Sequence, residues 1–105
     1  MSTHFLHAAG AAALALATAA APLNAAAAAG QVVGGIEAVL FVCASIDAKS
    51  VKPGQEILQR AVEQRKLDLA AIRKSDAYRS TYNAEVNRLL ALPQRERLSA
   101  CQSAW

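Results

Sequence analysis

The stretch "GIEAVLFVCASIDA", residues 35–48, decides which fold this chain can adopt. Its apolar side chains recur at spacings of three and four residues, at Ile36, Val39, Leu40, Cys43 and Ile46. That spacing places them on one face of a helix. Phe41 and Val42 fall off this face, so the helix is apolar over most of its circumference. Such a helix is typically the central one of its domain.

A buried strand is the alternative for the same stretch, because "VLFVCASI", residues 39–46, is rich in the β-branched and apolar residues that strands favour. A strand needs a second strand as its hydrogen-bonding partner. No other run of this kind occurs in the chain. The sequence therefore favours the helix.

The segments on either side of this helix contain signals for chain breaks. "QVVGG", residues 31–35, is expected to be a loose lead-in. In "SVKPG", residues 50–54, Pro53 restricts Lys52 to extended geometry and can itself open a helix. We therefore predict a break at 50–54 and a second helix over residues 53–66.

The last third of the chain has recognisable helix starts and stops. Asp68 can cap a short helical piece over 67–74, and Ser75 can cap a helix over 76–92. Pro93 ends that helix and can occupy the first position of a last helix over 93–105. The sequence thus predicts an all-α fold, a small four-helix domain with short connections.

The N-terminal segment is typical of an export signal. An apolar, alanine-rich stretch over residues 8–21 is followed by small residues that suit a signal peptidase. The best A-x-A site is Ala27-Ala28-Ala29, so we expect residues 1–29 to be removed and residues 30–105 to form the domain. An uncleaved anchor is the alternative, but about 20 strongly apolar residues are needed to span a bilayer. The expected location is periplasmic or secreted.

The two cysteines, Cys43 and Cys101, are predicted to form a disulfide. An even cysteine count in a small exported chain favours a bridge, and both residues lie on apolar helix faces near the two ends of the domain. The bridge would close a loop of about 58 residues, worth about 4 kcal/mol in the chain-entropy model. A lipid-bearing, metal-binding or redox cysteine fits less well, because the spacing of neither a lipoprotein signal nor C-x-x-C is present.

Histidine is missing from the expected domain, since His4 and His7 both lie in the signal. Nucleophilic sites that use His as the general base are therefore excluded from residues 30–105, as are zinc sites with His ligands. The carboxylates are scattered, with no paired set in an apolar setting. We expect no enzyme activity, no cofactor and no metal.

Several exposed side chains are weak candidates for binding. Residues 60–74 are basic, and the residues concerned are Arg60, Arg65, Lys66, Arg73 and Lys74. Tyr78 and Tyr82 lie one helical turn apart, and Trp105 follows Cys101 by four residues, which suggests that Trp105 covers the disulfide. Each set also has a structural explanation, as a solvated helix face or as part of the core.

The sequence therefore predicts a non-enzymatic exported protein that binds another protein, as an inhibitor, an immunity factor or an accessory factor. A protein that binds an anionic membrane surface through residues 60–74 is one alternative. A periplasmic stress chaperone is another, because the outline of signal, helices and one long-range disulfide is similar to that of small acid-stress chaperones. "FVCASID", residues 41–47, lacks the Trp and the acidic-aromatic pair expected around the first cysteine of those proteins. Nucleic acid is not an expected partner.

Overall fold

The computed structural model describes residues 25–105, and over this range it contains five helices and no strand. The helices are the N-terminal helix Ala25–Ala44, α2 Ala48–Arg65, α3 Leu69–Arg73, α4 Asp76–Ala91 and α5 Gln94–Gln102. The all-helical prediction is confirmed, with α3 adding a short fifth helix to the four expected. Most of the expected signal, residues 1–24, lies outside the described residues.

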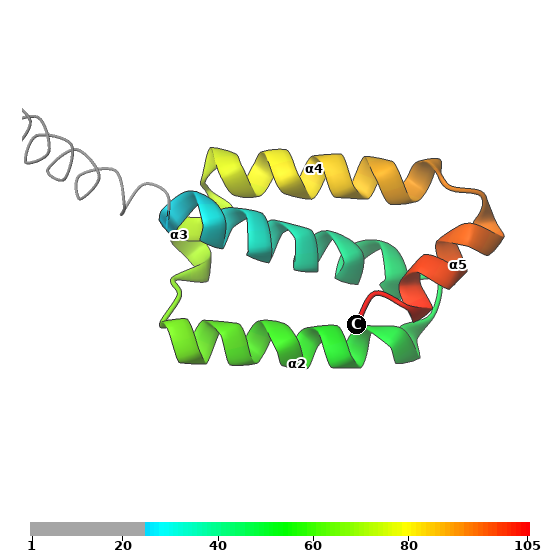
Figure 1. Cartoon of the computed structure of the whole chain (residues 1–105), viewed down its shortest axis with the longest axis horizontal. Helices are drawn as coiled ribbons and strands as arrows, with labels where there is room; N and C mark the ends of the chain where they lie inside the picture. The colour runs from blue at the N-terminus through cyan, green and yellow to red at the C-terminus, as the bar shows by residue number, and fades with distance from the viewer. Residues whose placement is uncertain (1–24) are drawn as a thin grey trace, which may run out of the picture.

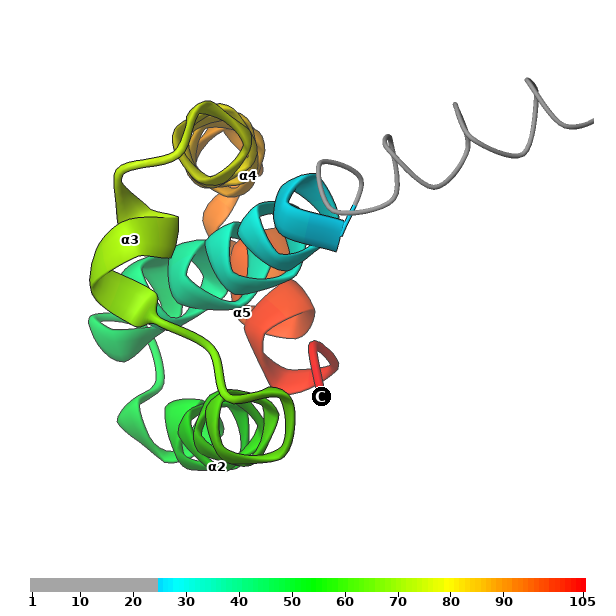
Figure 2. The same cartoon turned by 90° about the vertical axis from the view of Figure 1, so that its left-hand side faces the viewer.

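The N-terminal helix lies between α2 and α4 (Figure 1). It runs antiparallel to α2 and parallel to α4, while α3 and α5 lie at the two ends of this three-helix layer. The end-on view in Figure 2 separates α3 and α5 onto opposite sides of the N-terminal helix. The helix that carries the most apolar stretch is therefore the central one.

Helix α4 comes unusually close to the N-terminal helix at two glycines. A methyl group added at Gly34 would lie 2.8 Å from the backbone oxygen of Tyr78 and 3.3 Å from the backbone nitrogen of Tyr82. One added at Gly30 would lie 3.0 Å from the backbone nitrogen of Tyr78. At Gly34 only a residue without a Cβ allows this approach, and at Gly30 a Cβ would fit only if α4 moved slightly.

The expected loose lead-in over residues 31–35 is wrong, because these residues are helical. Val33 and Gly34 are buried there, and burial outweighs the low helix propensity of the glycines. Length and apolar character would also let helix Ala25–Ala44 cross a membrane. In this domain the helix lies between α2 and α4 (Figure 1), and 33% of its most apolar 18 residues are buried.

The expected break over residues 50–54 is also wrong, because α2 begins at Ala48 and contains Pro53. Asp47 is the N-cap, and its carboxylate accepts a hydrogen bond from the backbone N–H of Lys49. The start of the helix is therefore set by a cap upstream of the proline. Pro53 removes one hydrogen bond from the second turn without ending the helix.

The remaining helix starts agree with the sequence within two residues. Asp68 caps α3 by accepting from the Ala71 N–H, and Ser75 caps α4 by accepting from the Tyr78 N–H, each at 3.2 Å. Pro93 is the N-cap of α5 rather than its first residue. Arg97 of α5 then donates to the backbone oxygens of Leu89, Leu90 and Leu92 at 3.0–3.1 Å. These bonds satisfy the free carbonyls at the end of α4.

The predicted disulfide between Cys43 and Cys101 is present, with Cα atoms 5.5 Å apart. Both cysteines are fully buried. The buried hydrophobic side chains among the described residues are few, namely Val33, Ala38, Val42, Cys43, Leu89 and Cys101. A core this small makes the crosslink between the N-terminal helix and α5 a large part of the stability.

We predict opposite effects of the same substitution at two neighbouring glycines. Gly35 has no atom within 4 Å of the position where a methyl group would lie. Gly35→Ala should therefore raise the free energy of unfolding by about 0.5–1 kcal/mol through helix propensity. Gly34→Ala should lower it by about 1–2 kcal/mol, because the methyl group pushes α4 away. Urea unfolding of the two variants measures the difference, and equal shifts would contradict the close approach of α4.

Candidate functional site

The structure brings together some of the binding candidates and separates the others. Arg73 of α3 and Tyr78 and Tyr82 of α4 lie in one cluster beside the N-terminal helix. The remaining candidates lie elsewhere. They are Arg60 and Arg65 in α2, Lys66 and Lys74 at the ends of α2 and α3, and Trp105 at the C-terminus.

The cluster is centred on Glu37 of the N-terminal helix. Arg73 donates two hydrogen bonds to it, from Nε to Oε1 at 2.9 Å and from Nη2 to Oε2 at 2.6 Å. The Tyr78 hydroxyl donates to Oε1 at 2.8 Å. Glu37 thus joins three helices, whereas the other two ion pairs between described residues, Asp76–Arg79 and Glu85–Arg88, both lie within α4.

The electrostatics of the cluster favour a charged Glu37. The hydrogen bond from Arg73 lowers the pKa of Glu37 below its usual 4.5, against the desolvation that raises it, and the Tyr78 hydroxyl assists Arg73. Burial, followed by the bond to Glu37, raises the pKa of Tyr78 to about 12. The Arg73 pKa is raised by the same pairing. Glu37 and Arg73 therefore form a structural ion pair rather than an acid–base pair poised near neutral pH.

An aromatic surface, formed by Phe41, Tyr78 and Tyr82, adjoins this ion pair. The two tyrosine rings are stacked with centroids 5.6 Å apart, and Phe41 lies against Tyr82 at 6.2 Å. Phe41 is 62% exposed, more than any other large apolar side chain in residues 25–105. Glu37 orients Tyr78, and Tyr78 stacks on Tyr82. The exposed ring of Phe41 therefore packs against tyrosines that are held in place.

The basic residues do not form one continuous patch. Arg73 is neutralised by Glu37. Arg60 and Arg65 flank a shallow hollow of about 250 Å³ on α2, lined also by Ile57, Ala61 and Gln64. Lys66 ends α2 with a left-handed backbone, φ 51°. The run of cations in the sequence is therefore divided among a helix, a turn and an ion pair.

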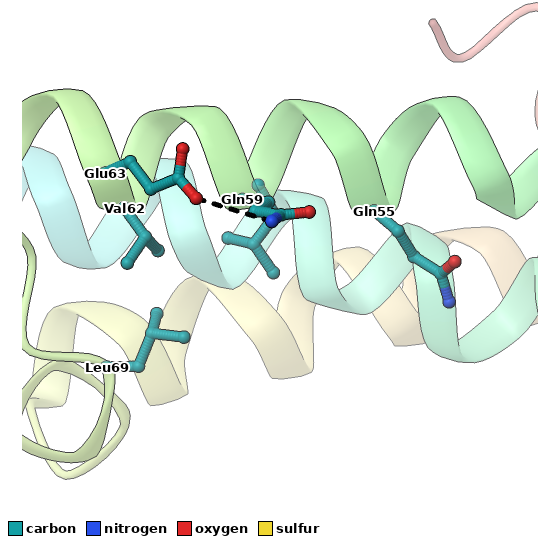
Figure 3. A pocket seen from close by; sticks show the side chains of 6 residues that line it. Gln55, Gln59, Val62, Glu63 and Leu69 are labelled. Atoms are coloured by element: carbon teal, nitrogen blue, oxygen red, sulfur yellow. Dashed lines mark hydrogen bonds between the residues drawn. The ribbon is translucent and has the colours of Figure 1, made fainter.

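A second hollow, of about 310 Å³, lies between α2 and α3 (Figure 3). Its floor is apolar, formed by Leu58, Val62 and Leu69, and in Figure 3 Leu69 points from α3 toward Val62 of α2. Its rim is polar, with Gln59 donating to Glu63 at 3.3 Å. Glu63 is the only charged side chain that lines this hollow. The hollow therefore does not indicate a catalytic site.

The indole of Trp105 packs on α2 at Gly54, which is buried. That Trp105 also covers the disulfide stays a prediction. A methyl group at Gly54 would occupy the position of the indole ring. The terminal tryptophan, 37% exposed, therefore fastens the end of the chain to α2.

The sequence reasoning missed Glu37 and Phe41 as site residues. One signal was available, because Glu37 is the only charged residue between Gly30 and Ile46. A lone charge in an apolar helix must find a partner when that helix is buried. The exposure of Phe41 had no comparable signal, because its position off the apolar face fits a buried helix equally well.

Comparisons with known proteins give no further direction. No family model matches this chain, no curated protein matches it, and no solved structure matches it. Among residues 25–105, no three His, Cys, Asp or Glu side chains come together in a way that could hold a metal ion. The features of the described residues that bear on function are therefore the Glu37 cluster and the aromatic surface.

Replacing Glu37 by Gln should lower the free energy of unfolding by about 1–2 kcal/mol at neutral pH. The change removes the charge from hydrogen bonds that are worth more than neutral ones, reduced here because Arg73 is 47% exposed. A group with a lowered pKa stabilises the fold above its unfolded pKa and loses that effect as the pH falls through its folded pKa. The difference between wild type and Glu37→Gln should therefore shrink below pH 4.5.

Urea unfolding at several pH values between about 7 and 3 measures this dependence. Glu85→Gln is the matched control, since Glu85 also has a lowered pKa but pairs only with Arg88 in its own helix. It should cost no more than about 0.5 kcal/mol. Equal losses from both variants would show that Glu37 does not join the helices.

Gly54→Ala should displace Trp105, although alanine is the better helix former. Trp105 is the only tryptophan in the chain, so its fluorescence reports the contact directly. We expect emission at longer wavelength than in wild type because the indole enters water. Gly35→Ala is the control and should leave the emission unchanged. A Gly54→Ala variant with wild-type emission would contradict the packing of the indole on α2.

Proposed function

We propose that this chain is a non-enzymatic exported protein that binds another protein through the aromatic surface. The observation that carries the proposal is Phe41, a phenyl ring 62% exposed to water beside Tyr82 and Tyr78. Aromatic side chains are enriched at the centres of protein interfaces. Single exposed apolar residues are common, but this one belongs to a supported cluster.

The support beneath the ring favours binding. Glu37 holds Tyr78 and Arg73 in place, and the disulfide fixes Cys43, which follows Phe41 closely in the same helix. Side chains that are already ordered lose less entropy when a partner binds. The partner we expect is a protein with an apolar pocket for Phe41. It would be the target of an inhibitor, the toxin that an immunity factor blocks, or the main subunit that an accessory factor joins.

Export is supported by where the expected cleavage site lies relative to the buried part of the domain. Ala25–Ala28 are exposed, and Gly30 is the first buried residue in the described part of the chain. The expected cut after Ala29 thus falls directly before the first buried residue among those described. The buried disulfide adds to this, because such bonds form and persist in oxidising compartments. We propose residues 30–105 as the mature domain, periplasmic or secreted.

An anionic membrane surface is the alternative partner. It is favoured by Arg60 and Arg65, which share a hollow on α2 and form no ion pair with residues 25–105. It is weakened by Arg73, whose charge Glu37 neutralises, and by the exposed carboxylate of Glu63 nearby on α2. The aromatic surface therefore carries the leading proposal.

A photo-crosslinking residue tests this proposal in the cells that produce the protein. Benzoyl-phenylalanine at position 41 should give a discrete crosslinked protein species, because its ring takes the place of Phe41 in the interface. The same residue at position 90 is the matched control, since Leu90 is an apolar α4 residue that is 50% exposed. A species that forms equally from both positions, or from neither, would contradict a partner at the aromatic surface.

A further inference from the structure

The bond expected to be cut by signal peptidase, Ala29–Gly30, lies inside a folded helix. Helix Ala25–Ala44 passes through it without a break. Ala25–Ala28 are exposed, and Ala29 is half-buried in a hollow that Ala71 and Ile72 of α3 also line, whereas Gly30 directly after the bond is buried. A peptidase must bind residues on both sides of the bond, and the residue on the C-terminal side, Gly30, is buried in the domain.

The start of α4 covers this buried side. A methyl group at Gly30 would lie 3.1 Å from the Ser75 Oγ and 3.0 Å from both the Ala77 Cβ and the Tyr78 backbone nitrogen. One turn further on, Gly34 meets the Tyr78 backbone oxygen. Unwinding the chain just after Ala29 would therefore break the contact between the N-terminal helix and the start of α4.

Proteolysis of a helix depends on such opening, because a peptidase binds its substrate as an extended strand and not as a helix. We propose that Ala29–Gly30 is cut only before α4 packs on the N-terminal helix, and that the folded domain protects the bond. Hydrolysis adds one water across the amide and leaves a carboxylate on Ala29 and an ammonium group on Gly30. The proposal rests on the export signal proposed above.

Two products are expected, depending on whether cleavage or folding happens first. Asp76, which begins α4, and Cys101, which closes the disulfide, both emerge long after Ala29. Cleavage before that point releases the domain with Gly30 at its N-terminus. Folding first keeps residues 1–29 attached and leaves the domain joined to its apolar N-terminal segment. The relative rates of folding and cleavage thus set the proportion of free and tethered protein.

The test uses the full-length, disulfide-bonded chain in detergent micelles with a purified bacterial signal peptidase. Wild type and Gly35→Leu should resist cleavage, because Gly35 faces open space. Gly34→Leu should be cut at least about tenfold faster, because the side chain separates α4 from the N-terminal helix. Mass spectrometry should give Gly30 as the new N-terminus. Gly34→Ala gives a milder separation if Gly34→Leu does not fold, and circular dichroism with thiol titration establishes folding.

The outcomes separate this proposal from the one on which it rests. If folded wild type is cut after Ala29 as fast as a reduced and unfolded sample, the protection is refuted and the signal stands. If the unfolded chain is not cut there either, the export signal is refuted, and the proposal with it. Equal rates for Gly34→Leu and Gly35→Leu would show that the packing of α4 does not control access.

Discussion

The close approach of α4 to the N-terminal helix is the constraint on which the rest of the structure depends. At Gly34 the two backbones come so near that a single methyl group would collide with the Tyr78 oxygen. Because the helices lie this close, the Tyr78 hydroxyl can donate a hydrogen bond to the carboxylate of Glu37. The same distance brings Tyr82 against Phe41. The ion pair and the aromatic surface are therefore both consequences of two missing side chains.

The disulfide holds the other end of the same helix. The hydrophobic core of residues 25–105 is small and made largely of short side chains, and a domain of this size rarely gains more than about 3–5 kcal/mol from its core alone. Cys43–Cys101 joins the central helix to α5, Arg97 ties α5 to the end of α4, and Trp105 closes on Gly54 of α2. A few specific contacts thus replace the large apolar interior of a bigger protein.

The parts of the fold that the sequence predicts are those with local causes. The apolar spacing around Cys43 and the caps at Asp68 and Ser75 depend on residues within a turn of one another, and the structure has them where expected. The error at residues 31–35 has a distant cause, because Gly34 is buried against α4, and a local pattern cannot contain that information. The error at Pro53 has a local cause, because the Asp47 cap starts α2 upstream of the proline and the helix continues through it.

The candidate site shows the same division. Arg73, Tyr78 and Tyr82 could be singled out from their chemistry, but their common partner, Glu37, lies 36 and 41 residues from Arg73 and Tyr78 in sequence. Arg60 and Arg65 belong to the same basic run as Arg73 and yet lie on another helix. The run of basic residues in the sequence therefore does not predict a basic patch. In the fold, Arg73 is paired with Glu37, whereas Arg60 and Arg65 lie apart from it on α2.

The two glycines also link the proposed binding surface to the proposed processing. If Gly34 were larger, α4 would move away, Tyr78 would lose Glu37, and the bond after Ala29 would become accessible. In the proposed processing, the contact that orders the aromatic surface would also end the period in which the signal can be removed. A chain that is cleaved early and then folds acquires both properties in the right order, because the surface forms only once the N-terminal helix has α4 against it. The close packing of α4 accounts for glycine at two positions one turn apart on the side of this apolar helix that faces α4.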